Sequence, residues 1–250
     1  MHLLHTEFIV SSSLTIATIS INRVTTLKEI KMNIPQNVIN EIKLTKPAFF
    51  KGVFDKFFTW KDLENLLNLR PFVNADRCKI INQKTYNWQR QTWMSDVNTF
   101  PPSILDTEIR QFHCYLSDAS RANEKTNAIC AELEQTFSGG ASDAHIYFNL
   151  AETPDNGFGI HWDFSHNLIV QMEGQSKFQV WDDTVVGDRN VTFLSEQPII
   201  DVVMEPGDAV FVPLNVYHQA TSMSKRLSIS FPISFNNETA TQERHWIKIT

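Results

Sequence analysis

The chain has 250 residues, of which 42% are hydrophobic and 20% are charged, and this excludes a disordered or fibrous protein. Twenty-eight acidic residues against 22 basic residues give a net charge of −6. That sign disfavours nucleic acid as a partner, because nucleic-acid binders gain affinity by neutralising phosphates. Three cysteines without a paired motif predict neither a disulfide framework nor a thiolate zinc site, so we expect a reducing, cytoplasmic location.

Residues 1–31 are expected to be an N-terminal extension, either loosely ordered or forming an added strand. Their apolar run has no preceding basic residue and is interrupted by Glu7 and several hydroxyl residues, which argues against a signal peptide. The run is also too polar to span a bilayer, so no membrane association is expected. Residues 32–250 are predicted to form a single domain.

The first part of this domain, residues 32–143, is predicted to be mostly helical. Thr59 and Asp62 form a capping-box pattern, and leucines follow at helical spacing at positions 63, 66 and 67. Ser103 follows two prolines and predicts the start of a second helix. A third helix is predicted over residues 120–137, where two glycines end the apolar pattern.

Residues 144–235 change to a period of two and are predicted to form about nine short strands. Glycine, proline, asparagine and aspartate separate these segments, and no helical pattern intervenes. Such spacing indicates a closed antiparallel sandwich or barrel, so the predicted fold class is a mainly β barrel with an N-terminal helical cap. The predicted strands cover residues 145–150, 160–163, 168–172, 177–181, 191–194, 199–204, 209–212, 216–220 and 227–233.

His161 and Asp163 lie two residues apart in one of the predicted strands. Alternate side chains of a strand share a face, so these two side chains can bind one metal ion. By itself the pattern is weak evidence, because a core histidine hydrogen-bonded to a neighbour has the same appearance in sequence. A further ligand is needed to distinguish the two interpretations.

A further histidine follows in a more specific context. Gly207 and Pro213 are spaced so that His218 comes just after a tight turn and a short strand. This arrangement resembles the second motif of cupins, with Asn215 where a glycine is usual. Two histidines and one carboxylate on a rigid barrel form the facial triad that binds non-haem iron(II) and leaves coordination positions open. The expected metal ligands, and the catalytic centre, are His161, Asp163 and His218.

A third match lies on the last predicted strand, which begins Arg226-Leu227-Ser228. The order of the triad followed by Arg-x-Ser resembles the iron(II) and 2-oxoglutarate-dependent oxygenases, and the segment 161–181 resembles their JmjC and cupin-like branch. That resemblance implies a double-stranded β-helix in which Arg226 and Ser228 bind the far carboxylate of 2-oxoglutarate. It also implies co-substrate contacts from Asn167 and Tyr147. A guanidinium suits this role because it binds a carboxylate through two parallel hydrogen bonds.

One position departs from the pattern of the family. The relatives place a Lys or Arg two residues after the glycine that corresponds to Gly174, and this chain has Ser176 there. Lys177 is adjacent, but strand alternation predicts that it points away from the pocket. Either Arg226 supplies the charge from the other strand, or the chain has lost 2-oxoglutarate; we favour the first interpretation.

The resemblance implies an oxygenase that hydroxylates a C–H bond of a protein, peptide or small molecule and releases succinate and CO2. Two alternatives stay open at this point. A metal-dependent cupin of another reaction class, such as an isomerase or an oxo-acid-independent dioxygenase, would share the triad, although most have a fourth, glutamate ligand where this chain has Asn167-Leu168. A non-enzymatic binding barrel would not use the triad for catalysis. We expect a monomer or a small homo-oligomer.

Overall fold

The structure is a computed structural model of the whole chain. It describes residues 34–69, 77–82, 87–88, 106–107, 109–137, 141–154, 157–184 and 197–235. The predicted N-terminal extension, the strand predicted at 191–194 and most of the helix predicted after Ser103 lie outside these residues. None of the helices within the described ranges has the length and hydrophobicity needed to cross a membrane.

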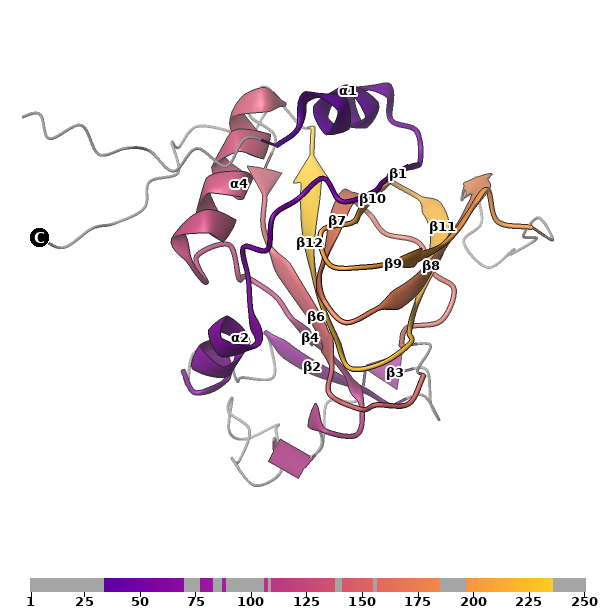
Figure 1. Cartoon of the computed structure of the whole chain (residues 1–250). Coiled ribbons are helices and arrows are strands. Elements are labelled where there is room, and N and C mark those ends of the chain that lie inside the picture. Colours follow the sequence, from indigo (N-terminus) through magenta and orange to yellow (C-terminus); the bar gives the residue numbers. More distant parts are fainter. Residues whose placement is uncertain are drawn as a thin grey trace, which may run out of the picture. The chain divides into compact units, whose positions relative to one another are not determined.

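Two antiparallel sheets form a double-stranded β-helix, which confirms the predicted fold class (Figure 1). The larger sheet has the strand order β1-β10-β7-β12-β6-β4-β2-β3, with β5 paired to β12, and the smaller has the order β11-β8-β9. The strands of the larger sheet are β1 (Ala48–Phe50), β2 (Cys78–Asn82), β3 (Asn87–Trp88), β4 (His113–Leu116), β5 (Ala141–Ser142), β6 (His145–Asn149), β7 (His166–Glu173), β10 (Ala209–Val212) and β12 (Arg226–Ser234). Those of the smaller sheet are β8 (Ser176–Thr184), β9 (Ile200–Met204) and β11 (Val216–Ser222).

Seven of the nine predicted strands are present with bounds within three residues of the prediction, and they are β6 to β12. The segment predicted at 160–163 forms only an isolated bridge between His161 and His218. This bridge is relevant to function, because it joins two of the predicted metal ligands directly.

The prediction that residues 32–143 are mostly helical is wrong where strands lie between the helices. Strands β1, β2 and β4 fall in this stretch, and β4 joins the barrel by pairing with β6, as in Leu116 opposite Ile146. The helices α1 (Gln36–Leu44), α2 (Trp60–Leu67) and α4 (Glu124–Thr136) supply the cap. The capping box at Thr59 is confirmed, whereas α4 begins four residues later than predicted because Asn123 accepts a hydrogen bond from the Thr126 amide and caps it.

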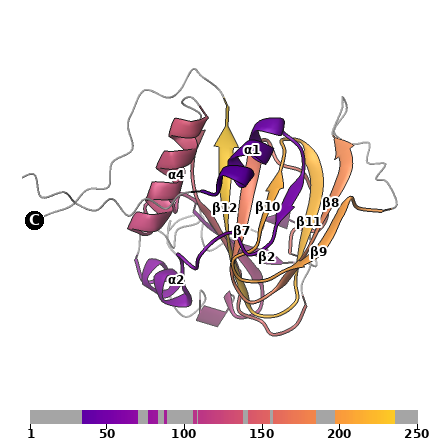
Figure 2. The ribbon, with the colours of Figure 1, turned by 45° about the horizontal axis from the view of Figure 1, so that its top comes forward.

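The domain has two hydrophobic layers on opposite sides of the larger sheet. Helices α2 and α4 lie on the side away from β8, β9 and β11 (Figures 1 and 2). One face of β7 and β12 packs in the same cluster as the helices, through residues such as Val170 and Ile229. The second cluster lies inside the barrel and includes Phe178, Val180 and Val210. The central strands are therefore buried on both faces, and their inward face lines the barrel interior.

Candidate metal centre

His161 and His218 are held side by side by their own backbone. The His161 amide donates to the His218 carbonyl oxygen at 3.0 Å, and the His218 amide donates to the His161 carbonyl oxygen at 2.8 Å. The two imidazole centroids are 4.3 Å apart. Together with Asp163, the two histidines offer ligand atoms that all lie within 4.8 Å of one another. The structure thus brings the three predicted ligands to one point.

Both histidines present the same ring nitrogen to the site. The Nδ1 atom of His161 lies 3.0 Å from the Gly159 carbonyl oxygen, and Nδ1 of His218 lies 3.0 Å from the Val216 carbonyl oxygen. A carbonyl oxygen can only accept, so each Nδ1 carries the hydrogen and each neutral ring keeps the Nε2 lone pair for a ligand. Burial, reinforced by the charge of His218, lowers the pKa of His161 to about 4, which favours this neutral form.

Three neighbours contact Asp163, two through its side chain and one through its backbone. Its Oδ2 atom accepts a hydrogen bond from Asn167 Nδ2 at 2.7 Å and lies 3.4 Å from Nε2 of His218. Its backbone carbonyl oxygen accepts from the Asn215 amide at 3.0 Å. Burial opposes the charge on Asp163, but the neighbouring His218 and His161 outweigh it and hold the pKa of the carboxyl below its usual value. The carboxylate form is the one that binds metal.

The second motif folds through two residues with positive φ. Gly207 has φ +94°, and a β-carbon there would lie 2.8 Å from the Phe54 carbonyl oxygen, so only glycine fits this turn. Asn215 occupies the position where cupins usually have glycine, and its φ is 64°. Asparagine tolerates this left-handed conformation better than most residues. The departure from the cupin pattern therefore preserves the backbone that leads into His218.

A pocket opens beside the three predicted ligands. Arg226 and Ser228 line it from β12, and Tyr147 lines it from the adjacent strand β6. Arg226 is only 3% exposed and Ser228 only 1%. The full lining consists of Tyr147, Phe158, His161, Asp163, Ile169, Phe178, His218, Ala220, Arg226, Ser228 and Ser230. Three of the four predicted co-substrate residues thus share one cavity with the metal ligands.

Asn167, the fourth predicted co-substrate residue, is not part of this lining. It is 4% exposed, and its amide donates to Asp163 while its oxygen accepts from Ser230 Oγ at 3.2 Å. The side chain therefore contacts a predicted metal ligand, whereas the sequence predicted a co-substrate contact for it. Its geometry suits a role in orienting the Asp163 carboxylate.

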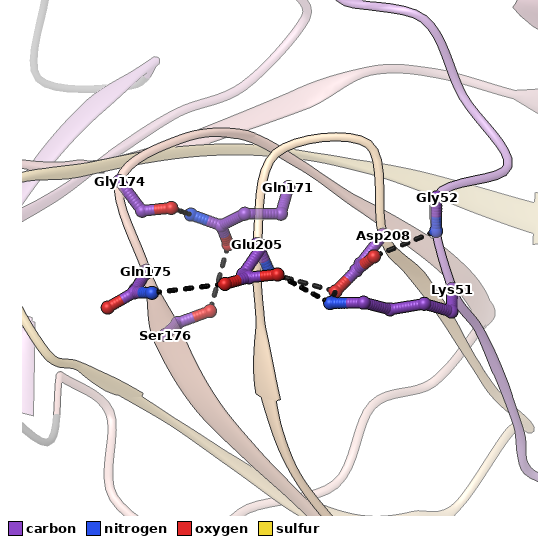
Figure 3. Close-up of polar contacts among 8 residues, drawn as sticks. All are labelled: Lys51, Gly52, Gln171, Gly174, Gln175, Ser176, Glu205 and Asp208. Carbon is purple, nitrogen blue, oxygen red and sulfur yellow. Dashed lines mark hydrogen bonds and ion pairs between the residues drawn. The ribbon is translucent and has the colours of Figure 1, made fainter.

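The position where the relatives have a Lys or Arg is occupied by a neutral buried pair. The Ser176 hydroxyl donates to Gln171 Oε1 at 2.8 Å, and the Gln171 amide donates to the Gly174 carbonyl oxygen (Figure 3). The same amide also donates to the Glu173 carbonyl oxygen. Lys177 points outward, as predicted, and its Nζ lies 3.1 Å from Asp201 Oδ1 on the exposed side of the smaller sheet. Lys177 therefore does not line the pocket, whereas Arg226 does.

One residue near the site was not predicted from the sequence. His113 on β4 is fully buried, and its Nε2 lies 2.8 Å from Nη2 of Arg226. It is 113 residues from its partner and belongs to no motif, so only the pairing of β4 with β6 and of β6 with β12 reveals the contact. Burial, with a contribution from the charge of Arg226, lowers the pKa of His113 well below its ordinary value.

Fold and site together define a class: a cupin-like double-stranded β-helix with a two-histidine, one-carboxylate metal centre. Residues 118–242 match the JmjC domain family, which is half of the chain. The chain belongs to this family, as the sequence motifs predicted.

Two relatives are similar to most of this chain. The bifunctional lysine-specific demethylase and histidyl-hydroxylase NO66 of Drosophila sechellia is 25% identical over 213 residues, which cover 80% of this chain and 30% of the relative. The protein of the same name from Dictyostelium discoideum is 25% identical over 194 residues, covering 73% of this chain and 36% of the relative. This chain therefore spans about a third of the length of these relatives.

Among solved structures, the Escherichia coli ribosomal oxygenase YcfD matches with a TM-score of 0.59 and 18% identity, covering 82% of this chain and 53% of that chain. A structure of YcfD with cobalt and 2-oxoglutarate matches with a TM-score of 0.51 and 18% identity, covering 77% and 49%. At this level of identity the likeness is one of fold.

Proposed function

We propose that this domain is an iron(II) and 2-oxoglutarate-dependent oxygenase that hydroxylates a C–H bond of a polypeptide. The observation that carries the proposal is the placement of the triad, Arg226 and Ser228 around one pocket. When bound, iron(II) and 2-oxoglutarate together supply the oxidising chemistry with dioxygen and release succinate and CO2. The residues of the chain bind and orient these two groups and exclude water from them.

The ligand set fits iron(II). Two neutral imidazoles with their Nδ1 hydrogens already bound to carbonyl oxygens, and one ionised carboxylate, are the donors that such a metal prefers. The outer contacts fit as well, because Asn167 and the two backbone carbonyls fix the rings and the carboxylate before a metal binds. One carboxylate leaves a net positive centre, which favours an anionic co-substrate.

The pocket fits a dicarboxylic co-substrate. Ser228 Oγ is buried and has no hydrogen-bond partner among the described residues, and a buried hydroxyl without a partner is costly. A ligand carboxylate beside Arg226 would accept hydrogen bonds from both side chains. Arg226 would hold the far carboxylate, Ser228 would support it, and Tyr147 would close the same wall of the pocket.

A polypeptide substrate is supported by the relatives, which are named as a histidyl-hydroxylase and lysine-specific demethylase and as a ribosomal oxygenase. Exposed apolar side chains next to the predicted ligands in sequence support it too, since Ile160 precedes His161, Phe164 follows Asp163, and both offer apolar contact. A mass-spectrometric screen of peptide mixtures for a gain of one oxygen atom, about 16 Da, tests this assignment; a modified small metabolite with no modified peptide would overturn it.

The activity itself is tested without the prime substrate. With iron(II), ascorbate and oxygen, the wild-type protein should convert 2-oxoglutarate slowly to succinate, and Asp163→Ala should abolish the conversion. Asp201→Ala is the matched control, because this aspartate lies on the outer side of the barrel with Lys177. Succinate at background level in a protein with iron bound would instead indicate a metal-dependent cupin of another reaction class.

A further inference from the structure

The buried contact between Arg226 and His113 lies next to the pocket but is not part of the metal centre. Arg226 is 3% exposed and His113 is fully buried, and their Nη2 and Nε2 atoms are 2.8 Å apart. A guanidinium has donors only, so the imidazole must accept, and its hydrogen must be on Nδ1. Burial and the neighbouring charge lower the pKa of His113 well below its ordinary value, which is consistent with a neutral acceptor.

We propose that His113 is a positioning residue that orients the Arg226 guanidinium toward the far carboxylate of the co-substrate. This inference rests on the proposed function. A neutral acceptor directs one N–H of the guanidinium toward β4 and leaves the positive charge undiminished. An Asp or Glu at position 113 would orient the guanidinium as well, but it would neutralise the charge and compete with the ligand carboxylate.

The structure also fixes the imidazole from its other side. A β-carbon on Gly157 would lie 3.0 Å from Nδ1 of His113, so the chain passes as close to the ring as a glycine allows. Gly157 has φ +55°, which also favours glycine. The next residue, Phe158, packs edge-on against His113 with ring centroids 6.2 Å apart, and it lines the pocket. His113 is therefore held between the pocket wall and the arginine that it orients.

The placement of Arg226 gives this contact its importance. In this chain Ser176 and Gln171 fill the position where the family has a basic residue, so the cation enters the pocket from β12. A side chain with several rotatable bonds needs a fixed partner to present its planar edge in one direction. His113 provides that partner from β4, which lies one strand beyond β6 in the larger sheet.

The test is a double-mutant cycle on binding of 2-oxoglutarate, measured by calorimetry on the manganese-loaded protein, in which no turnover occurs. His113→Leu removes the acceptor and should raise the Kd of 2-oxoglutarate by about tenfold or more. His113→Gln keeps an acceptor near the Nε2 position and should stay within about threefold of wild type. In an Arg226→Ala background, His113→Leu should have no further effect, because the residue that it positions is gone.

Tyr115→Phe is the matched control, since Tyr115 lies two residues along the same strand and its hydroxyl is 3.0 Å from Nδ1 of His145. It should leave the Kd for 2-oxoglutarate unchanged, and the Kd for manganese should be unchanged in all variants. Should His113→Leu not fold, His113→Asn replaces it, because its shorter amide cannot reach Arg226. A wild-type protein that binds manganese but not 2-oxoglutarate would overturn the proposed function and this inference together. Tight wild-type binding with no loss in His113→Leu, or an equal loss in the Arg226→Ala background, would overturn this inference alone.

Discussion

The two sheets face each other across one pocket with opposite chemistry. The larger sheet contributes mostly polar side chains, namely Tyr147, Arg226, Ser228 and Ser230. The smaller sheet contributes Phe178 and Ala220, with the metal ligand His218 as its polar member. Both sets are largely buried, so burial alone does not distinguish the functional wall from the packing wall.

This difference follows from what lies behind each sheet. Strand β12 is buried on both faces, and its outward residues, such as Leu227 and Ile229, already pack in the cluster that contains the helices. Its inward face is therefore free to hold polar groups, provided that a partner or a ligand satisfies them. The smaller sheet has apolar residues on its inward face, such as Phe178 and Val180, and these belong to the interior cluster. We expect mutations on the smaller sheet to affect stability and mutations on the larger sheet to affect ligand binding.

The largest effect is expected on the apolar wall. Phe178 is 2% exposed and stacks on His218, with ring centroids 6.0 Å apart. Phe178→Ala should lower the free energy of unfolding by about 3 to 5 kcal/mol, because it leaves a cavity in the interior cluster. Denaturant unfolding measures this, with Gln179→Ala on the outer side of the same strand as control. A loss below 1 kcal/mol would show that this wall contributes little to stability.

The next largest effect is expected for a residue of the polar wall. It should change the affinity for 2-oxoglutarate and not the free energy of unfolding. Arg226→Ala should weaken 2-oxoglutarate binding by about 2 to 5 kcal/mol and leave metal affinity nearly unchanged, because it removes the cation that pairs with the carboxylate. Lys177→Ala should be close to neutral, since Lys177 pairs with Asp201 outside the pocket. The reverse ranking in a titration of the two variants would assign the far carboxylate to Lys177.

A smaller effect separates binding from stability at a single hydroxyl. Ser228→Ala should weaken 2-oxoglutarate binding by about 1.5 kcal/mol, the low end for a hydrogen bond to a charged group. The free energy of unfolding of the ligand-free protein should be unchanged or slightly higher, because this buried hydroxyl has no partner among the described residues. Calorimetric titration and denaturant unfolding of the same sample measure the two quantities. A stability loss without a binding loss would assign Ser228 to the packing wall.

The smallest effect concerns pH. The pKa of His113 is well below the ordinary value of 6.5 because of burial and the charge of Arg226. Below pH 6.5 the unfolded chain therefore takes up a proton that the folded domain excludes, so stability falls as the pH falls, by up to about 1.4 kcal/mol per pH unit. Denaturant unfolding of the metal-free protein at pH 6.5 and 5.5 should show a decrease that is smaller in His113→Gln. An identical decrease in both proteins would contradict a buried neutral His113.

The sequence predicted most of the barrel and all three members of the triad. Alternation of apolar residues located β6 to β12, and the spacing of His161, Asp163 and His218 predicted a cluster that the structure shows. Strands β1, β2 and β4 were missed because each has too few residues for an alternating pattern to be recognised next to helical segments. Sequence spacing also gave no indication of the His113 contact, which depends on strand pairing across more than a hundred residues.

The contacts of Asn167 show a different limit of motif reasoning. Family resemblance predicted a direct contact with the co-substrate, and the structure shows a hydrogen bond of 2.7 Å to Asp163. A motif identifies which residues are near a site, but the rotamer decides which group each one contacts. The family, the fold class and the neighbourhood of the site were thus predictable, whereas the role of each side chain required coordinates.

The bridge between His161 and His218 has a consequence for how the protein acquires its metal. Two peptide hydrogen bonds hold the two histidines side by side in the folded protein. A metal ion therefore finds its ligands in place, and its binding costs little further conformational entropy. We therefore expect the ion to exchange with the surrounding pool while the barrel stays closed, unlike in domains that collapse only around their metal. A chelator should then remove the metal and leave a folded protein that can bind metal again. The concentration of available iron would set the fraction of protein molecules that hold the metal.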